Sequence, residues 1–180
     1  MYVWTGIDVE RQLTAIKQRA WEINDALVFE NFCTTLPLHI SLKMSFCVED
    51  AIADDVMNTI EKYYATIEPF EIPVKGIEDE GCIVWIRMDE CAELNRIHDD
   101  LNRILSERYG VGLHEYDCDY KFHTTLFMGR EEEKLHAAYA QIKDEPLPQK
   151  LVANRFVIGG SESGELGTYA VFRTLVQGEQ

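Results

Sequence analysis

Apolar residues recur along the chain with two different periods, which predict four helices and seven strands. Apolar side chains spaced by three and four residues predict helices after Asp8, near 50–66, after residue 91 and between 131 and 143. Alternating or continuously apolar runs predict strands at 2–7, 37–47, 70–77, 82–88, 121–129, 151–159 and 167–176. Three residues are expected to mark helix ends: Asp8 as a cap, Gly110 after the third helix and Pro146 after the fourth.

The strand predicted at 37–47 has a polar face of unusual composition. In LPLHISLKMSF, Leu38, Ile40, Leu42, Met44 and Phe46 point one way, whereas His39, Ser41, Lys43 and Ser45 point the other. A solvated strand face is normally filled with Thr, Lys or Glu. A histidine followed two residues later by a hydroxyl therefore needs an explanation.

The same four-residue pattern occurs again in the second half of the chain. HISL at 39–42 and HTTL at 123–126 share histidine, any residue, hydroxyl and leucine, and they lie close to half the chain apart. The order strand, helix, histidine strand, helix and strand pair also occurs twice. We interpret this as an internal duplication, with residues 1–180 forming a single domain of two pseudo-symmetric lobes.

The two motifs together indicate acid–base chemistry on an anion. Side chains at i and i+2 lie on one face of a strand, so each motif presents an imidazole beside a hydroxyl. If the two strands face each other, two histidines can share proton transfers near neutral pH. The two hydroxyls can bind the non-bridging oxygens of a phosphate. The pattern therefore favours in-line substitution at phosphorus.

With these motifs, their spacing and the repeated element order, the chain resembles the two-histidine (2H) phosphoesterases over nearly its whole length. That family includes bacterial 2′-5′ RNA ligase-like proteins and 2′,3′-cyclic nucleotide phosphodiesterases. The resemblance implies a bilobal α/β (α+β) fold, with two antiparallel sheets around a central cleft and helices packed outside. It also implies catalytic His39 and His123, phosphate-binding Ser41 and Thr125, and no metal or other cofactor. Ser41 stands where threonine is more common.

Four basic residues near the motifs are further candidates for the site. Lys43 and Lys121 share strand faces with the two histidines and are candidate phosphate ligands, the alternative being lysines that protect an edge strand. Arg130 and Arg173 are expected to be solvated or ion-paired in preference to binding a ligand.

The remaining polar groups are expected to be structural. His98 and His136 fall within predicted helices and are expected at the surface. His114 lies with Glu115, Asp117 and Asp119 in a loop whose spacing matches no metal motif, which favours a solvated acidic loop. Cys118 in that loop is expected to be an incidental thiol. GGSESG at 159–164 lacks the lysine of a phosphate loop and is expected to form a turn.

Composition and charge limit the ligands. The chain is 46% hydrophobic and 27% charged, and its formal net charge is −15. That charge argues against binding along long nucleic acid and leaves a small nucleotide or an RNA terminus as the expected substrate. The five cysteines form no CxxC pair and are expected to be free thiols in the cytoplasm. No signal peptide or membrane-spanning run is recognisable, so no membrane partner is expected.

The expected activity is metal-independent hydrolysis of a 2′,3′-cyclic phosphate to a 2′-phosphate, with 2′-5′ RNA ligase-type activity and a role in RNA processing left open. One alternative is a phosphoesterase for another cyclic phosphate, such as ADP-ribose 1″,2″-cyclic phosphate. The other is a non-catalytic module that binds nucleotides or RNA ends. The resemblance favours His123 as base and His39 as acid, whereas the residues themselves are symmetric and do not decide.

Overall fold

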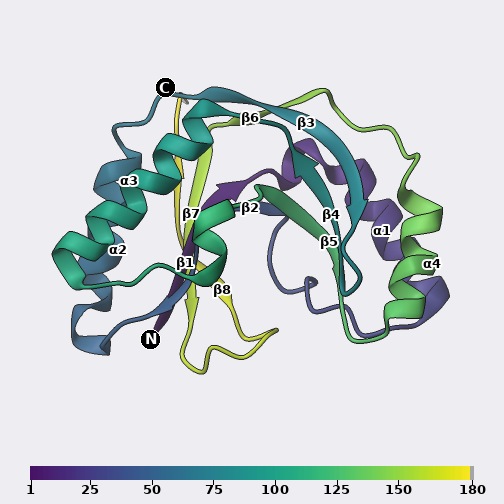
Figure 1. Cartoon of the computed structure of the whole chain (residues 1–180), viewed down its shortest axis with the longest axis horizontal. Helices are drawn as coiled ribbons and strands as arrows, with labels where there is room; N and C mark the ends of the chain where they lie inside the picture. Colours follow the sequence, from purple (N-terminus) through teal and green to yellow (C-terminus); the bar gives the residue numbers. More distant parts are fainter. Residues whose placement is uncertain (179–180) are drawn as a thin grey trace.

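A computed structural model describes residues 1–178, which form two antiparallel sheets of four strands and four long helices (Figure 1). The first sheet has the order β2 (His39–Cys47), β1 (Tyr2–Asp8), β7 (Arg155–Ser161) and β8 (Ala170–Val176). The second sheet has the order β5 (His123–Met128), β4 (Ile83–Met88), β3 (Phe70–Asp79) and β6 (Lys150–Ala153). The expected fold class is confirmed.

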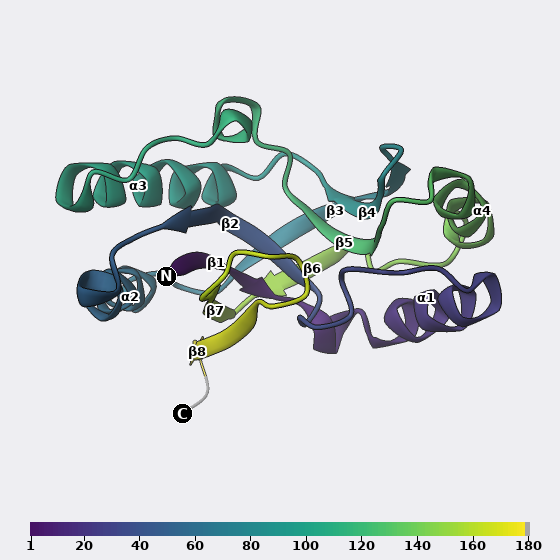
Figure 2. The ribbon, with the colours of Figure 1, turned by 90° about the horizontal axis from the view of Figure 1, so that it is seen from below.

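The helices pack in pairs on the outside of the sheets. The four are α1 (Thr14–Leu27), α2 (Asp50–Tyr64), α3 (Ala92–Tyr109) and α4 (Glu132–Ile142). Helices α2 and α3 contact the first sheet, whereas α1 and α4 contact the second, and the two pairs lie at opposite ends of the molecule (Figure 2). Their apolar stripes are buried, as Leu94, Ile97 and Leu101 of α3 show. Within residues 1–178, no helix combines the length and apolarity needed to cross a membrane.

The two sheets exchange strands between the halves of the chain. In each sheet the histidine strand lies at one edge, beside the first strand of its own half, and the third strand comes from the other half. The third strands are β7 in the first sheet and β3 in the second. The edge strands β2 and β5 contact each other in the middle of the molecule (Figure 1). This topology is the one that a duplicated chain with exchanged strands would adopt; the duplication itself stays a prediction.

Two boundaries differ from the expectation. The first helix was expected directly after Asp8 and begins at Thr14. Asp8 is instead the last residue of β1, and its carboxylate accepts a hydrogen bond (3.0 Å) from the backbone N–H of Glu10. Glu10 is the first residue of the short helix η1 (Glu10–Gln12), which precedes α1. The segment expected as one strand at 151–159 is two strands, β6 and β7, which belong to different sheets. The ends near Gly110, in the left-handed conformation (φ 68°), and before Pro146 are as expected.

Candidate active site

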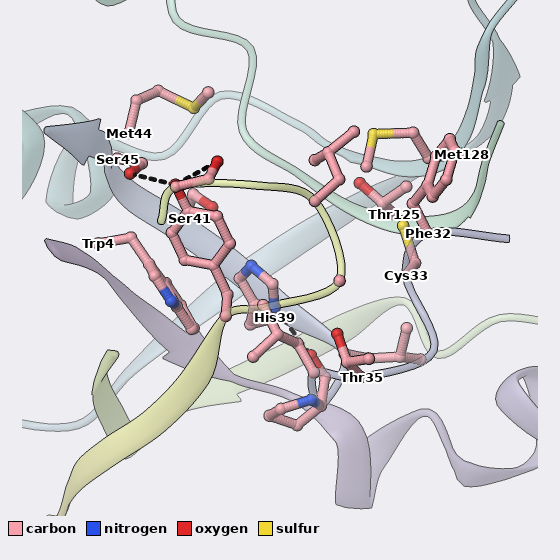
Figure 3. Close-up of a pocket in the computed structure, with 17 residues that line it drawn as sticks. Trp4, Phe32, Cys33, Thr35, His39, Ser41, Met44, Ser45, Thr125 and Met128 are labelled. Carbon is pink, nitrogen blue, oxygen red and sulfur yellow. Dashed lines mark hydrogen bonds between the residues drawn. The ribbon is translucent and has the colours of Figure 1, made fainter. Parts of the chain in front are cut away.

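A pocket of about 250 Å³ lies where the two histidine strands meet. His39 and Ser41 of β2 line it from one side and Thr125 of β5 from the other, facing each other across the cavity (Figure 3). His123 is the first residue of β5, two residues before Thr125. It is close enough to His39 for the charge of His39 to lower the pKa of His123. The fold therefore brings the two distant motifs to one place.

Both imidazoles are held in the same way by the backbone. The Nδ1 atom of His39 lies 2.8 Å from the carbonyl oxygen of Pro37, and that of His123 lies 2.6 Å from the carbonyl oxygen of Lys121. Because a carbonyl only accepts hydrogen bonds, Nδ1 must carry the proton and donate it. In the neutral ring the lone pair is then on Nε2, which can accept a proton from a substrate or, once protonated, return one.

Each imidazole also lies against an indole. The ring centroids of Trp4 and His39 are 4.4 Å apart, and those of Trp85 and His123 are 4.0 Å apart. Both tryptophans are buried. Trp4 can lie close to the sheet because Gly159 has no side chain: a Cβ there would be 2.6 Å from the indole nitrogen. The indoles fix the ring planes and exclude water from one face of each histidine.

The charged neighbours of the two histidines have opposite signs. Across the strand pairs, Asp8 lies opposite His39 and Arg87 lies opposite His123. Burial lowers the pKa of His39, while the Pro37 carbonyl and the Asp8 carboxylate act to raise it. Burial lowers the pKa of His123 to about 4; the Lys121 carbonyl opposes this shift, and the charges of His39 and Arg87 add to it. The environment therefore disfavours the protonated form of His123, and Asp8 supports that of His39.

Two loops that the sequence patterns did not assign to the site build the rest of the pocket. One of them contains the end of the turn expected at 159–164, whose first three residues belong to β7. The segment 29–38 follows the edge of β5: Asn31 Nδ2 donates to the carbonyl of Leu126 (3.2 Å), and its Oδ1 accepts from the Met128 amide (3.1 Å). This loop places Phe32 against the cavity, and the 162–169 loop adds Leu166 and Tyr169, whose hydroxyl lies 2.7 Å from Ser45 Oγ. The residues that line the pocket include no Lys, Arg, Asp or Glu.

Lys43 does not occupy the position that its strand face suggested. Its side chain is 1% exposed and pairs with Asp117, whose own side chain is fully buried. β2 has two extra residues relative to β1, one between Ser41 and Lys43 and one between Lys43 and Phe46. The first shift leaves Leu42 and Lys43 both buried, and beyond Lys43 both Met44 and Ser45 reach the pocket. The Lys43 charge is neutralised under the 112–119 loop, and the expected phosphate contact is not supported by this position.

The other basic candidates are also not among the residues that line the pocket. Lys121 is 47% exposed and lies 3.7 Å from Glu80; only its carbonyl oxygen, the acceptor for His123, takes part in the site. Arg130 lies over the ring of Phe32, 5.6 Å from its centroid. Arg173 pairs with Asp54 and Glu61, in line with the expectation of an ion-paired residue.

Two expectations for the polar residues outside the motifs were wrong. His98 was expected at the surface and is buried. The buried ring donates from Nδ1 to the carbonyl of Leu42 (2.9 Å) and stacks on Tyr120. The loop around η2 (Glu115–Asp119) is not solvated throughout, because Asp117 is buried and His114 caps η2. His136 is exposed, as expected, and pairs with Asp79. Among residues 1–178, no three side chains of His, Cys, Asp or Glu gather as a potential metal site.

Comparison with known proteins places the site in a known fold. The model of the 2′-5′ RNA ligase superfamily matches residues 9–165. Three solved structures resemble the chain: Escherichia coli LigT complexed with 3′-AMP (13% identity, TM-score 0.59, 98% of both chains), TT0787 of Thermus thermophilus (15%, 0.58, 100% of both) and Kluyveromyces marxianus Usb1 (12%, 0.50, 97% of both). At these identities the likeness shows a common fold. No curated protein sequence matches the chain.

Proposed function

Because the chain belongs to the 2′-5′ RNA ligase superfamily, whose members are phosphoesterases and ligases, we propose that it hydrolyses 2′,3′-cyclic phosphates of nucleotides or short RNA ends to 2′-phosphates. One observation carries the proposal: two imidazoles with their Nδ1 atoms bound to carbonyls flank the hydroxyls of Ser41 and Thr125. This arrangement can supply a base, an acid and two donors for one phosphate.

The proposed reaction uses the two histidines in opposite roles. Neutral His123 takes a proton from water through Nε2, and the water oxygen attacks phosphorus. The bond from phosphorus to the 3′-oxygen breaks on the opposite side, and protonated His39 donates its Nε2 proton to the leaving oxygen. Ser41 and Thr125 donate hydrogen bonds to the non-bridging oxygens, where negative charge accumulates in the transition state. The opposite charges of Asp8 and Arg87 support this assignment of roles.

The lining of the pocket supports a nucleoside beside the reacting phosphate. The pocket presents Phe32, Leu166 and Met128 together with hydroxyls, and its lining includes no Lys, Arg, Asp or Glu. Such a surface suits the flat, uncharged base of a nucleotide. We therefore propose that the terminal nucleoside occupies this pocket while its cyclic phosphate contacts the two hydroxyls.

A turnover assay in the presence of EDTA tests the proposal. The substrates are the four nucleoside 2′,3′-cyclic phosphates, a 2′-5′-linked dinucleotide and ADP-ribose 1″,2″-cyclic phosphate. We expect hydrolysis of the nucleoside cyclic phosphates without added metal, because the histidines supply both proton transfers, and ³¹P NMR should identify the 2′-phosphate.

Three results would contradict the proposal. Turnover of the ADP-ribose compound alone would support the alternative phosphoesterase. Binding of the nucleotides without any turnover would support a binding module. A 3′-phosphate product would show that the leaving group is the 2′-oxygen.

A further inference from the structure

We propose that Arg87 and Tyr120 form a second anion-binding subsite, which binds a phosphate group of the substrate other than the one that reacts. The proposal rests on the function proposed above and makes it more specific: the preferred substrate carries a second phosphate. This phosphate is either the internal phosphodiester of an RNA end or a terminal 5′-phosphate.

The first observation is an unpaired buried charge. Arg87 is half-buried, its Nη1 atom is buried, and among residues 1–178 this atom has no hydrogen-bond partner. The charge of Arg87 acts on Glu78, but Glu78 pairs instead with Lys75, at 2.8 Å. A buried guanidinium nitrogen without an acceptor is costly for a folded protein. Its planar set of donors is well suited to phosphate.

The second observation is an unpaired hydroxyl on another residue of the same cavity wall. The Tyr120 hydroxyl is buried and has no hydrogen-bond partner within residues 1–178. The same residues, Arg87 and Tyr120, line one cavity of about 240 Å³. Tyr120 is held there by the ring of His98, whose centroid is 4.5 Å away. Burial raises the pKa of Tyr120, so its phenol remains a neutral hydrogen-bond donor.

Arg87 and Tyr120 each lie next to a residue of the reacting centre. Arg87 lies opposite His123 in the β4–β5 pair. The Tyr120 hydroxyl is close to Ser41, which acts to lower its pKa, although the two are not hydrogen-bonded. The pocket proposed for the nucleoside contains His39, Ser41 and Thr125 but neither Arg87 nor Tyr120. The two cavities therefore share no lining residue.

The charge around the cavity favours an anion at its inner end. The exposed Lys75 and the first turn of the 18-residue helix α3, with Cys91 and Asn95, also line the cavity. The positive end of the helix dipole is therefore beside it. The carboxylates of Asp89 and Glu90 lie at the exposed rim, where solvent screens them. The chain carries a net charge of −15, so most of its surface repels anions. A positive charge opposite His123 is therefore a local exception that would attract a phosphate to this place.

The test compares substrates that share the reacting group. They are adenosine 2′,3′-cyclic phosphate, its 5′-phosphorylated form and the dinucleotide ApA with a 2′,3′-cyclic phosphate. We expect kcat/KM to be roughly 10- to 100-fold higher for at least one of the two substrates with a second phosphate. The substrate with the greater gain identifies the terminal phosphate or the internal phosphodiester as the natural group.

Variants assign this preference to the subsite. The measured quantity is the ratio of kcat/KM for a substrate with a second phosphate to kcat/KM for adenosine 2′,3′-cyclic phosphate. Arg87→Gln should bring this ratio to about one, and Tyr120→Phe should reduce it by roughly 3- to 10-fold. The effect of Arg87 on His123 cancels in this ratio, because every substrate uses the same histidine. Arg103→Gln removes the same charge from the exposed face of α3, where Arg103 pairs with Asp100, and should keep the ratio. Thermal unfolding checks that each variant is folded.

Two outcomes would overturn the subsite while leaving the proposed function intact: equal kcat/KM values for all three substrates in the native protein, or an unchanged preference in Arg87→Gln. If no substrate is hydrolysed, the proposed function fails and calorimetry tests the subsite alone. Adenosine 3′,5′-bisphosphate should then bind roughly tenfold more tightly than adenosine 3′-phosphate, and Arg87→Gln should remove the difference. Equal affinities in the native protein would overturn the subsite.

Discussion

The half-sites around His39 and His123 share their local geometry and differ in their surroundings. Each imidazole donates from Nδ1 to the carbonyl two residues earlier and lies on an indole. The residue opposite His39 on the neighbouring strand is Asp8, with a negatively charged carboxylate. The residue opposite His123 is Arg87, with a positively charged guanidinium. Geometry alone would make the two histidines interchangeable. The difference in charge supports the proposed division of roles, with His39 as the acid and His123 as the base.

A second contrast lies farther along the same strands. Lys43 of β2 is buried with Asp117, while Phe127, at the equivalent position of β5, is buried against Phe29 with ring centroids 5.7 Å apart. One half therefore fixes its histidine strand with an ion pair under a loop, and the other with an apolar contact.

Removing either histidine should have the largest effect. His39→Ala and His123→Ala should each lower kcat by about 10²–10⁴, because each performs one proton transfer. Both act in one transition state, so the double variant should be little worse than the poorer single variant. Steady-state kinetics with a nucleoside cyclic phosphate measures this, with His136→Ala at the exposed surface as control. Full activity in either single variant would contradict the mechanism.

Breaking the ion pair should destabilise the half that contains His39. Asp117→Asn leaves the Lys43 charge buried without a counter-charge and should cost about 3–5 kcal/mol of unfolding free energy. The double variant Lys43→Met with Asp117→Asn should recover most of that loss. Phe127→Leu in the other half should cost less, about 1.5 kcal/mol or below. Urea unfolding measures all three; a double variant as unstable as Asp117→Asn would show that the pair has another role.

The pH dependence should separate the acid from the base. The base acts when neutral, so kcat/KM should rise as pH increases through the pKa of His123, about 4. The acid acts when protonated, so the rate should fall as pH passes the lowered pKa of His39. Arg87→Gln should move the acidic limb to higher pH, because it removes a charge that lowers the pKa of His123.

Asp8→Asn should move the alkaline limb to lower pH, because it removes a charge that raises the pKa of His39. Asp8 also pairs with Arg155 at 2.8 Å, so Arg155→Gln is the control for that contact. If Arg87→Gln moved the alkaline limb and Asp8→Asn the acidic limb, the roles of the two histidines would be reversed.

The indoles should have the smallest and most selective effect. An aromatic face stabilises a nearby cation by about 0.5–1 kcal/mol. If His39 is the protonated partner, Trp4→Leu should reduce kcat/KM about two- to fivefold more than Trp85→Leu. Matched kinetics at the pH optimum of each variant measures the difference. A greater loss in Trp85→Leu would indicate that His123 carries the proton.

Features that depend on neighbouring positions in the chain could be predicted from the sequence. The spacing of apolar residues indicated all four helices, and Gly110 marked the end of α3 because it takes a conformation that few other residues adopt. The pairs His39 with Ser41 and His123 with Thr125 followed from the alternation of a strand. The repetition of this pair in the second half of the chain predicted one shared cleft, and the structure brings His39, Ser41 and Thr125 to one pocket.

Features that depend on pairing between distant strands were decided only by the tertiary structure. The offset between the two motifs aligns Trp4 with Met88 and Asp8 with Ala92, whereas the residues found beside His123 are Trp85 and Arg87. The chain between the paired residues differs in length: 39 − 8 = 31 positions separate Asp8 from His39, and 123 − 87 = 36 separate Arg87 from His123. Register shifts in the β1–β2 pair also turn Met44 toward the pocket. Alternation within one strand fixes which side chains share a face, but only the hydrogen bonds between strands decide which residues lie opposite one another.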